Sequence, residues 1–201
     1  MKNLKILAIA SVISVIAINN ANAKTEGNYL GLDLIRTELD FNTNNYGGNN
    51  LYEIKKDDQV SIGVNYKYAF NFDNFFVTPG VLYDYTNLSL KDKDGDKWNL
   101  NHRYGIGIDI GYDLHDKFAV FANISGIRSM YKVDWKSIVA SNRDYDDSMS
   151  YALGAKYSVL DNLDVKVSYE ISSVNMKEPT TVGRSTEFNI NIMRLGVSYK
   201  W

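Results

Sequence analysis

The stretch Tyr104-Gly105-Ile106-Gly107-Ile108-Asp109-Ile110-Gly111-Tyr112 alternates a large apolar residue with glycine or aspartate at every step. Successive side chains of a β-strand point to opposite sides of the sheet, so this segment predicts a strand with one apolar and one polar face. The same period of two extends through residues 60–68 and 163–172. Beyond the first 23 residues, no segment has the pattern of an amphipathic helix of useful length. The chain is therefore predicted to be all-β.

The alternation divides residues 24–201 into eight strands that are joined by two kinds of connection. Short turns follow the second, fourth and sixth strands, whereas the connections at 42–50, 91–97, 136–147 and 178–185 are longer and more polar. Short turns that alternate with long loops are typical of up-and-down transmembrane barrels, in which the short turns face the periplasm. The expected strands lie at 28–41, 51–70, 75–90, 98–114, 117–135, 148–159, 163–177 and 186–201.

Alternation alone does not decide which face of the barrel is outside, because a soluble lipocalin-like barrel has its apolar side inward. Two features favour the opposite arrangement. Glycines collect on the polar faces, which suits a narrow interior, and tyrosines collect near the strand ends, where membrane barrels carry aromatic girdles. We therefore expect an eight-stranded antiparallel transmembrane β-barrel with its apolar faces in lipid.

Three places depart from strict alternation. The apolar parity changes after Ile192 in the last strand and between Leu34 and Ile35 in the first. Pro79 lies within the third strand, where it has no N–H to donate to the ladder. A β-bulge, which adds one residue to one strand of a pair, is expected at each place.

The first residues have the three parts of a secretory signal. Two lysines precede the apolar run Ile6–Ile18, and Ala21-Asn22-Ala23 supplies the small-x-small cleavage pattern. The apolar run is too short to span a membrane comfortably, since a spanning helix needs about 20 residues. We expect cleavage between Ala23 and Lys24, which leaves 24–201 as one outer-membrane barrel domain after the signal peptide 1–23.

The composition excludes several classes of function. The chain has 22 Lys+Arg, 24 Asp+Glu and no cysteine. The absence of a long basic run argues against nucleic acid as a partner, and without cysteine no disulfide or thiolate metal site can form. Asp92–Asp96 is similar to the opening of a calcium loop, but Lys97 and Arg103 stand where that loop needs glycine and glutamate. We expect a charged external hairpin there, and no metal.

Two further observations bear on chemistry. With only two histidines, His102 and His115, no trio of nucleophile, base and orienting group can be placed, so neither an enzyme nor a cofactor is expected. The polar faces carry charges that should pair inside the barrel and plug it, because an unpaired buried charge is costly. A pore is therefore not expected. These charges are Asp33, Lys67, Asp84, Arg103, Asp109, Lys156, Glu170 and Arg194.

A family resemblance follows from these features together. The signal peptide, the alternating strands, the Tyr-rich faces and the closing Val197-Ser198-Tyr199-Lys200-Trp201 resemble small outer-membrane barrels of the opacity, Ail/Lom and OmpX type. Tyr199 and Trp201 resemble the signal that the barrel-assembly machinery reads. The Asn-, Lys- and Ile-rich composition is similar to that of AT-rich intracellular bacteria, in which such barrels resemble the rickettsial surface adhesins. The resemblance implies a barrel embedded in outer-membrane lipid whose external loops bind host-cell surface or serum proteins.

Aromatic and arginine side chains are favoured anchors in protein interfaces. We therefore expect adhesion contacts among five residues near the external ends of the strands and in the long loops. Tyr131 and Trp135 are also expected to form a hydrophobic patch above the membrane. The alternatives are that they are interface-belt or solvated loop residues, and that the protein is a structural barrel for envelope integrity without a ligand. A lipid-handling barrel is disfavoured by the interior charges. The five residues are Trp98, Trp135, Arg143, Tyr145 and Arg184.

Overall fold

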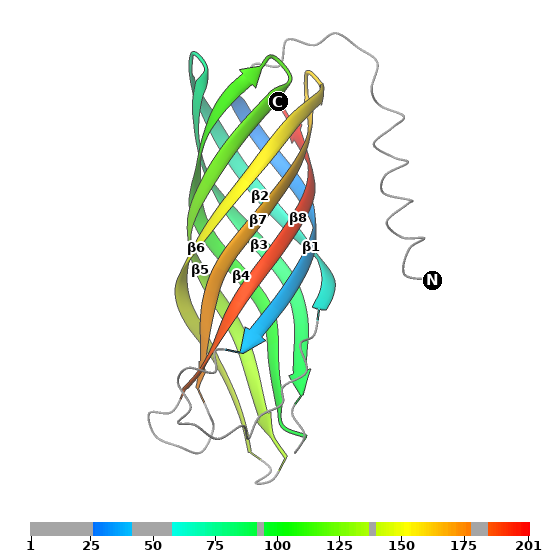
Figure 1. Cartoon of the computed structure of the whole chain (residues 1–201), viewed down its shortest axis with the longest axis vertical. Coiled ribbons are helices and arrows are strands. Elements are labelled where there is room, and N and C mark those ends of the chain that lie inside the picture. The colour runs from blue at the N-terminus through cyan, green and yellow to red at the C-terminus, as the bar shows by residue number, and fades with distance from the viewer. Residues whose placement is uncertain (1–25, 42–57, 92–94, 137–139, 178–184) are drawn as a thin grey trace, which may run out of the picture.

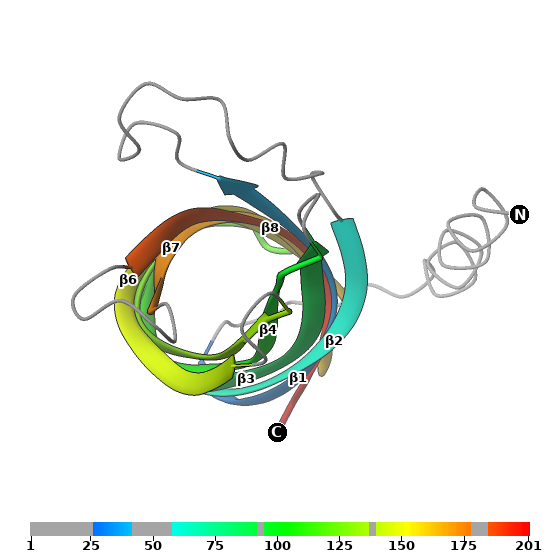
Figure 2. The same cartoon turned by 90° about the horizontal axis from the view of Figure 1, so that it is seen from below.

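The computed structural model describes residues 26–41, 58–91, 95–136, 140–177 and 185–201. Each strand pairs antiparallel with the next, and β8 closes the ring on β1 (Figures 1 and 2). This confirms the predicted eight-stranded, up-and-down barrel. Among these residues there is no helix of the length and hydropathy that a membrane crossing requires. The strands are β1 (Gly27–Phe41), β2 (Asp58–Phe72), β3 (Phe75–Lys91), β4 (Lys97–His115), β5 (Phe118–Trp135), β6 (Ala140–Leu160), β7 (Leu163–Lys177) and β8 (Ser185–Lys200).

The two ends of the barrel differ. At one end, which we call the terminal end, the three short turns lie beside the paired Asn28 and Trp201, which exchange two backbone hydrogen bonds of 3.2 Å. The long connections lie at the opposite end, the loop end. There β4, β5 and β6, with 19, 18 and 21 residues, reach further than β7 with 15 (Figure 1).

The sixth strand is longer than expected. It was predicted to start at residue 148, but it begins at Ala140, and residues 140–147 pair with β5 without a register shift. The predicted loop 136–147 is therefore mostly strand. The polar residues of this segment do not alternate with apolar ones, so the sequence pattern predicted a loop. Backbone pairing with β5 nevertheless makes residues 140–147 a strand. Residues 51–57 of the predicted second strand lie outside the described residues.

The expected bulges in the first and last strands are absent. The register of β8 with both β7 and β1 is continuous through Ile192, and that of β1 is continuous through Leu34 and Ile35. Pro79 also keeps an unshifted register opposite Ile108. The prediction of bulges at these places is wrong. The apolar residues change parity because the interior itself changes from polar to apolar along the barrel, so the apolar side of the strand moves from outside to inside.

A bulge does occur in β4. Against β5, the register of β4 shifts by one residue between Leu100 and His102. The register between β3 and β4 also shifts beside this point, between Tyr85 and Leu88 of β3. The extra residue reverses the parity of the strand. As a result Leu100 and Trp98 point inward, although they have the sequence parity of the outward-facing Tyr104.

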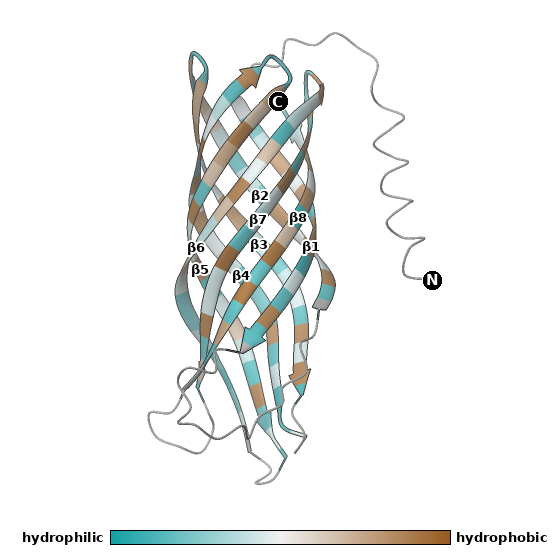
Figure 3. Ribbon diagram, in the orientation of Figure 1, coloured by the Kyte–Doolittle hydropathy of each residue, from teal (hydrophilic) through white to brown (hydrophobic). Residues whose placement is uncertain are grey.

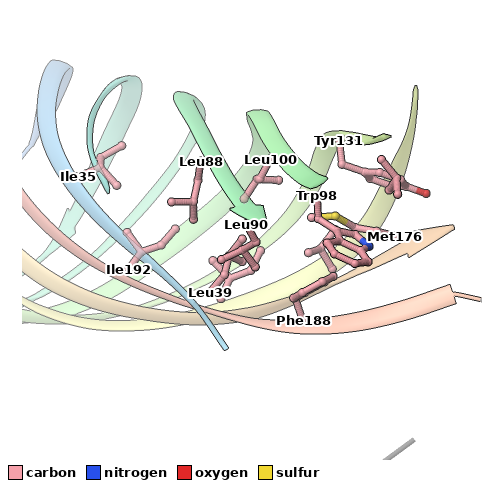
Figure 4. Packing of buried hydrophobic residues seen from close by; sticks show 13 residues of the cluster. Ile35, Leu39, Leu88, Leu90, Trp98, Leu100, Tyr131, Met176, Phe188 and Ile192 are labelled. Atoms are coloured by element: carbon pink, nitrogen blue, oxygen red, sulfur yellow. The ribbon is translucent and has the colours of Figure 1, made fainter. Parts of the chain in front are cut away.

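The interior near the loop end is filled by apolar side chains (Figure 4). We call this group the apolar plug. Its members come from β1, β3, β4, β5, β7 and β8 and are at most 3% exposed, so they pack as in the core of a water-soluble protein. The plug was not predicted. It consists of Ile35, Leu39, Leu88, Leu90, Trp98, Leu100, Tyr131, Val133, Val174, Met176, Phe188, Ile190 and Ile192.

Candidate functional site

The outward face carries an apolar band over the terminal half of the barrel. Figure 3 shows how apolar and polar residues alternate along the strands. On β3 this band runs from Phe75 to Tyr85, which are 58% and 45% exposed. The ten steps from Phe75 to Tyr85, at about 3.4 Å each and tilted by about 45°, give a height of about 24 Å, close to the ~25 Å apolar band of an outer-membrane barrel. An exposed apolar surface of this size is unfavourable in water, so it indicates contact with lipid.

Aromatic rings mark both edges of this band. At the terminal end the rings of Tyr199 and Trp201 stack at 6.2 Å between centroids. At the other edge Tyr83 donates to or accepts from His102 Nδ1 at 2.9 Å, and both side chains face outward beside Tyr85. Rings with a polar tip favour the two membrane interfaces, where one part of the ring is in lipid and the tip is in water. The predicted girdles are therefore present, with His102 at the edge.

Most of the predicted interior charges pair with one another, whereas Lys156 pairs at 3.6 Å with Asp164, which was not predicted. Arg194 donates to Asp84 at 2.6 Å and to Glu170 at 2.7 Å, and Arg103 donates to the same two carboxylates at 3.3 and 2.5 Å. Two cations and two anions, all buried, thus form a closed cluster in the middle of the barrel. We call it the charge cluster. Each charge has opposite neighbours, as burial requires.

Between the charge cluster and the terminal end, the interior is polar and partly hollow. Lys67 bonds Asp109 at 2.5 Å and Lys166 bonds Asp33 at 3.1 Å, around two cavities of about 40 Å³ each. Each cavity is large and polar enough to hold water. Gly196 allows this packing, because a Cβ there would lie 2.0 Å from Asp33 Oδ1. Lys166 was not among the predicted interior charges.

The charge cluster and the apolar plug together close the barrel. The cavities end at Glu170 and Arg194, and the plug fills the interior from there towards the loop end. The described residues therefore leave no open channel along the axis. The outward face and the loop end are where such a barrel can meet another molecule.

Comparison with known proteins decides the family. Residues 7–200 match the family described as outer membrane protein beta-barrel domain. The chain belongs to this family of outer-membrane β-barrels. It lies in the bacterial outer membrane, and its short turns face the periplasm, so the loop end is external. No curated protein matches the sequence.

Solved structures of other outer-membrane barrels share the fold. Ail, the attachment invasion locus protein of Yersinia pestis, has 13% identity and a TM-score of 0.57 over 88% of this chain and 100% of that one, in a crystal with the heparin analogue sucrose octasulfate. Neisserial surface protein A has 11% identity and a TM-score of 0.56 over 87% and 97%. These two likenesses show that the chain shares the fold of small outer-membrane barrels.

The two tryptophans expected to bind a partner do not lie on the outer surface. Trp98 is 3% exposed within the apolar plug, its ring centroid 6.3 Å from that of Phe188, and Trp135 packs against the same plug. Tyr131 is fully buried, so the expected hydrophobic surface patch is absent. The bulge in β4 turns Trp98 inward, and Tyr131 and Trp135 share the inward parity of β5. These rings stabilise the external end of the barrel from inside.

Arg143 and Tyr145 do face outward, from strand β6 rather than from a loop. Tyr145 is 52% exposed, and the Arg128 guanidinium lies 4.3 Å from the centroid of its ring. Arg184 and the cleavage residues Ala23 and Lys24 lie outside the described residues.

The outward face beside Arg143 is basic, which the sequence analysis missed. Lys132 on β5 lies directly opposite Arg143, and Lys97 on β4 lies directly opposite Lys91 on β3. Lys132 contacts Asp134 at 2.7 Å. Among the described residues Arg143 has no hydrogen bond or ion pair. We call these four cations the basic face, and the cross-strand register is the signal that reveals them, because residues far apart in the sequence become neighbours.

One exposed ion pair borders this face. The Arg128 guanidinium donates Nε to Asp147 Oδ1 and Nη2 to Oδ2, both at 2.6 Å. These hydrogen bonds hold the pKa of Asp147 below its ordinary value of 3.8. Because the folded-state pKa is lowered, the pair stabilises the fold fully above pH 3.8, and this contribution is lost as the pH falls through the lower pKa.

This lowered pKa can be measured directly. We expect the Asp147 carboxyl carbon, followed by NMR during acid titration, to change with a midpoint below 3.8 in the wild type. In Arg128→Met the midpoint should return towards 3.8, because the hydrogen bonds are gone. An equal midpoint in both proteins would show that the bidentate pair does not persist in solution.

Proposed function

We propose that this protein is a surface adhesin that binds anionic groups on host cells through the basic face. The observation that carries the proposal is the like-charged pair Lys132 and Arg143, directly opposite each other on the outward side of β5 and β6. Like charges in this position destabilise a sheet. Asp134, 2.7 Å from Lys132, offsets one of the two charges, which leaves the Arg143 guanidinium for an anionic ligand. Sulfate, carboxylate and phosphate groups are ligands that arginine and lysine bind well.

The basic face lies on a rigid support. Its residues belong to paired strands that extend beyond the apolar band, and the apolar plug packs against their inner side. Because the backbone that carries these cations is already fixed in paired strands, a ligand does not have to order it, which favours affinity. Tyr145 and Arg128 beside them add an aromatic ring and a further guanidinium.

The comparison with Ail supports the proposed ligand class. That protein, at 13% identity, was crystallised with a sulfated heparin analogue. The fold alone does not transfer the activity, so the proposal stands on the cations of this chain. Sulfated polysaccharides of the host-cell surface are the ligands that we expect, and host-cell or serum proteins with acidic patches are further candidates.

The test is binding of the folded protein in lipid nanodiscs to immobilised heparin. We expect Lys132→Glu together with Arg143→Glu to weaken binding at least about tenfold, because two attractive charges become repulsive. The control is Lys117→Glu with Lys200→Glu, which changes the net charge equally at the terminal end. Wild-type binding should fall steeply with added salt. Equal binding by both double variants would contradict the proposal.

A structural role in the envelope is the second candidate. It is favoured by the closed interior, in which the charge cluster and the apolar plug leave no route for a substrate. If this role is the principal one, a strain without the protein should become sensitive to detergent, and the basic-face double variant should restore resistance. If deleting the protein leaves adhesion unchanged and only resistance is lost, the structural role is favoured over the adhesin.

A further inference from the structure

A histidine lies on the outward side of the sheet, beside the basic face. His102 of β4 is directly opposite Met130 of β5, and Lys132 is the next outward residue of β5 towards the loop end. Arg128 is the next outward residue of β5 in the other direction. Diagonal neighbours on adjacent strands are about 7–8 Å apart, so His102 lies between two cations at this spacing.

The bulge in β4 puts His102 on the same side of the sheet as the basic face. Lys97 belongs to that face, and in a regular strand the side chains of residues 97 and 102 would point to opposite faces. The extra residue at the bulge reverses the parity between them, so both side chains point outward. The bulge therefore brings an imidazole to the exposed cations, from which strict alternation would have separated it.

The surroundings of His102 suit both charge states of its ring. Tyr83 Oη lies 2.9 Å from Nδ1. A hydroxyl group donates to an unprotonated nitrogen and accepts from a protonated one, so this contact is kept when a proton is added. The Tyr83 ring stacks on the imidazole at 5.9 Å between centroids, and the Tyr85 ring is tilted against it at 5.4 Å. Aromatic faces at such distances favour a cation.

The charged and titratable groups around His102 come from three strands. Among the residues that the structure describes, no carboxylate makes an ion pair with its ring, because Asp147 and Asp134 pair with cations of β5 instead. Asp147, whose pKa is held below 3.8, stays charged over the range in which histidine titrates. The groups that face His102 are Tyr83 and Tyr85 of β3, Tyr104 of β4, and Arg128 and Lys132 of β5.

A polyanion that binds across the basic face would lie beside His102. Negative charge close to an imidazole favours its protonated form, and by linkage the protonated form binds the anion more tightly. The chain has no cysteine and two histidines, and histidine is the side chain whose ordinary titration falls near neutral pH. The second, His115, pairs with Phe118 at the terminal end, on the periplasmic side. External binding can therefore depend on pH through His102 alone of the two.

We propose that His102 is a fifth cation of the basic face that is present only at acidic pH, so that binding of polyanions is coupled to uptake of a proton. The inference rests on the proposed function, because it concerns the regulation of the same site. The extra affinity is fully present at acidic pH and is lost as the pH rises through the titration of His102. One added charge on a water-exposed surface should raise the affinity about fivefold at low salt.

The test is binding of the folded protein, in nanodiscs of zwitterionic lipid, to immobilised dextran sulfate at about pH 5.5 and about pH 8. The lipid and the sulfate esters keep their charge over this range, so a change in affinity reports on the protein. We expect the wild type to bind about fivefold more tightly at the acidic pH. His102→Gln should lack this increase, whereas His102→Lys should bind equally tightly at both values. Heat-modifiable gel migration confirms that each variant is folded.

Two further measurements assign the effect to His102. His115→Gln leaves the external side unchanged and should keep the full dependence on pH. NMR of the two imidazole rings gives a readout that does not depend on affinity. Saturating dextran sulfate should move the titration midpoint of His102 to higher pH and leave that of His115 unchanged, because linkage between the proton and the anion is reciprocal.

The outcomes separate this inference from the proposed function. If the wild type binds equally at both pH values, or if His102→Gln keeps the increase, the inference is wrong. In either case the adhesin proposal still stands, provided that Lys132→Glu with Arg143→Glu weakens binding. Loss of the increase in His115→Gln would assign the coupling to the periplasmic end and would also overturn the inference. Failure of the wild type to bind at either pH would overturn both proposals.

Discussion

Arg194→Met is expected to destabilise the folded barrel by about 3–5 kcal/mol. Arg194 is 7% exposed and bonds both Asp84 and Glu170. Without it, two buried carboxylates share the single guanidinium of Arg103. The free energy of unfolding would be measured by urea titration in lipid, with circular dichroism and heat-modifiable gel migration as readouts.

The control for this prediction is another arginine at a strand position. Arg36 faces outward and contacts Glu38 at 3.3 Å with its side chain 55% exposed, so Arg36→Met should change the stability by less than about 1 kcal/mol. Adding Glu170→Gln to Arg194→Met should recover part of the loss, because one uncompensated charge is removed. A stability of Arg194→Met equal to that of Arg36→Met would show that the charge cluster is not essential.

Phe188→Ala is expected to cost about 3–5 kcal/mol, since a buried aromatic ring leaves a cavity when it is removed. Phe188 is fully buried in the apolar plug and its ring contacts that of Trp98. Asn189→Ala is the matched control, because Asn189 is the next residue and faces outward. The same urea titration measures both variants, and equal midpoints would mean that the plug contributes little.

Because the plug lies inside the barrel, substitutions in it test stability and not direct contact with a ligand. Trp98→Ala should lower stability as Phe188→Ala does, since both rings lie inside the barrel. The folded fraction of such variants must therefore be measured together with their binding. Loss of adhesion in a destabilised barrel does not place a residue at the interface.

The strands that cross the membrane could be predicted from the sequence. Within the apolar band, lipid outside and a polar interior inside impose one parity, so residues such as Ile106, Ile108 and Ile110 reveal both the strand and its orientation. The sequence predicts that Arg103 and Glu170 both face inward and that each needs a partner of opposite charge. It does not predict that they pair with each other, because it does not give the height of each residue along the barrel axis.

The external end could not be predicted in the same way. Where water replaces lipid, the outward face becomes polar and the interior apolar, so Ile190 and Ile192 appeared to require a bulge that the structure lacks. The bulge that exists, beside His102, has no marker in the sequence. The basic face was missed because Lys132 and Arg143 become neighbours only through the register of β5 and β6.

The reversal of polarity along each strand has a consequence for how the protein sits in the bilayer. On β5 the outward residues pass from Val120 and Ile124 to Arg128 and Lys132 within a few positions. If the barrel sat deeper in the bilayer, these cations would enter the hydrocarbon, and if it sat higher, isoleucine would be exposed to water. The sequence therefore fixes the depth of the barrel in the bilayer, and the residues of its external end stand at a set height above the lipid.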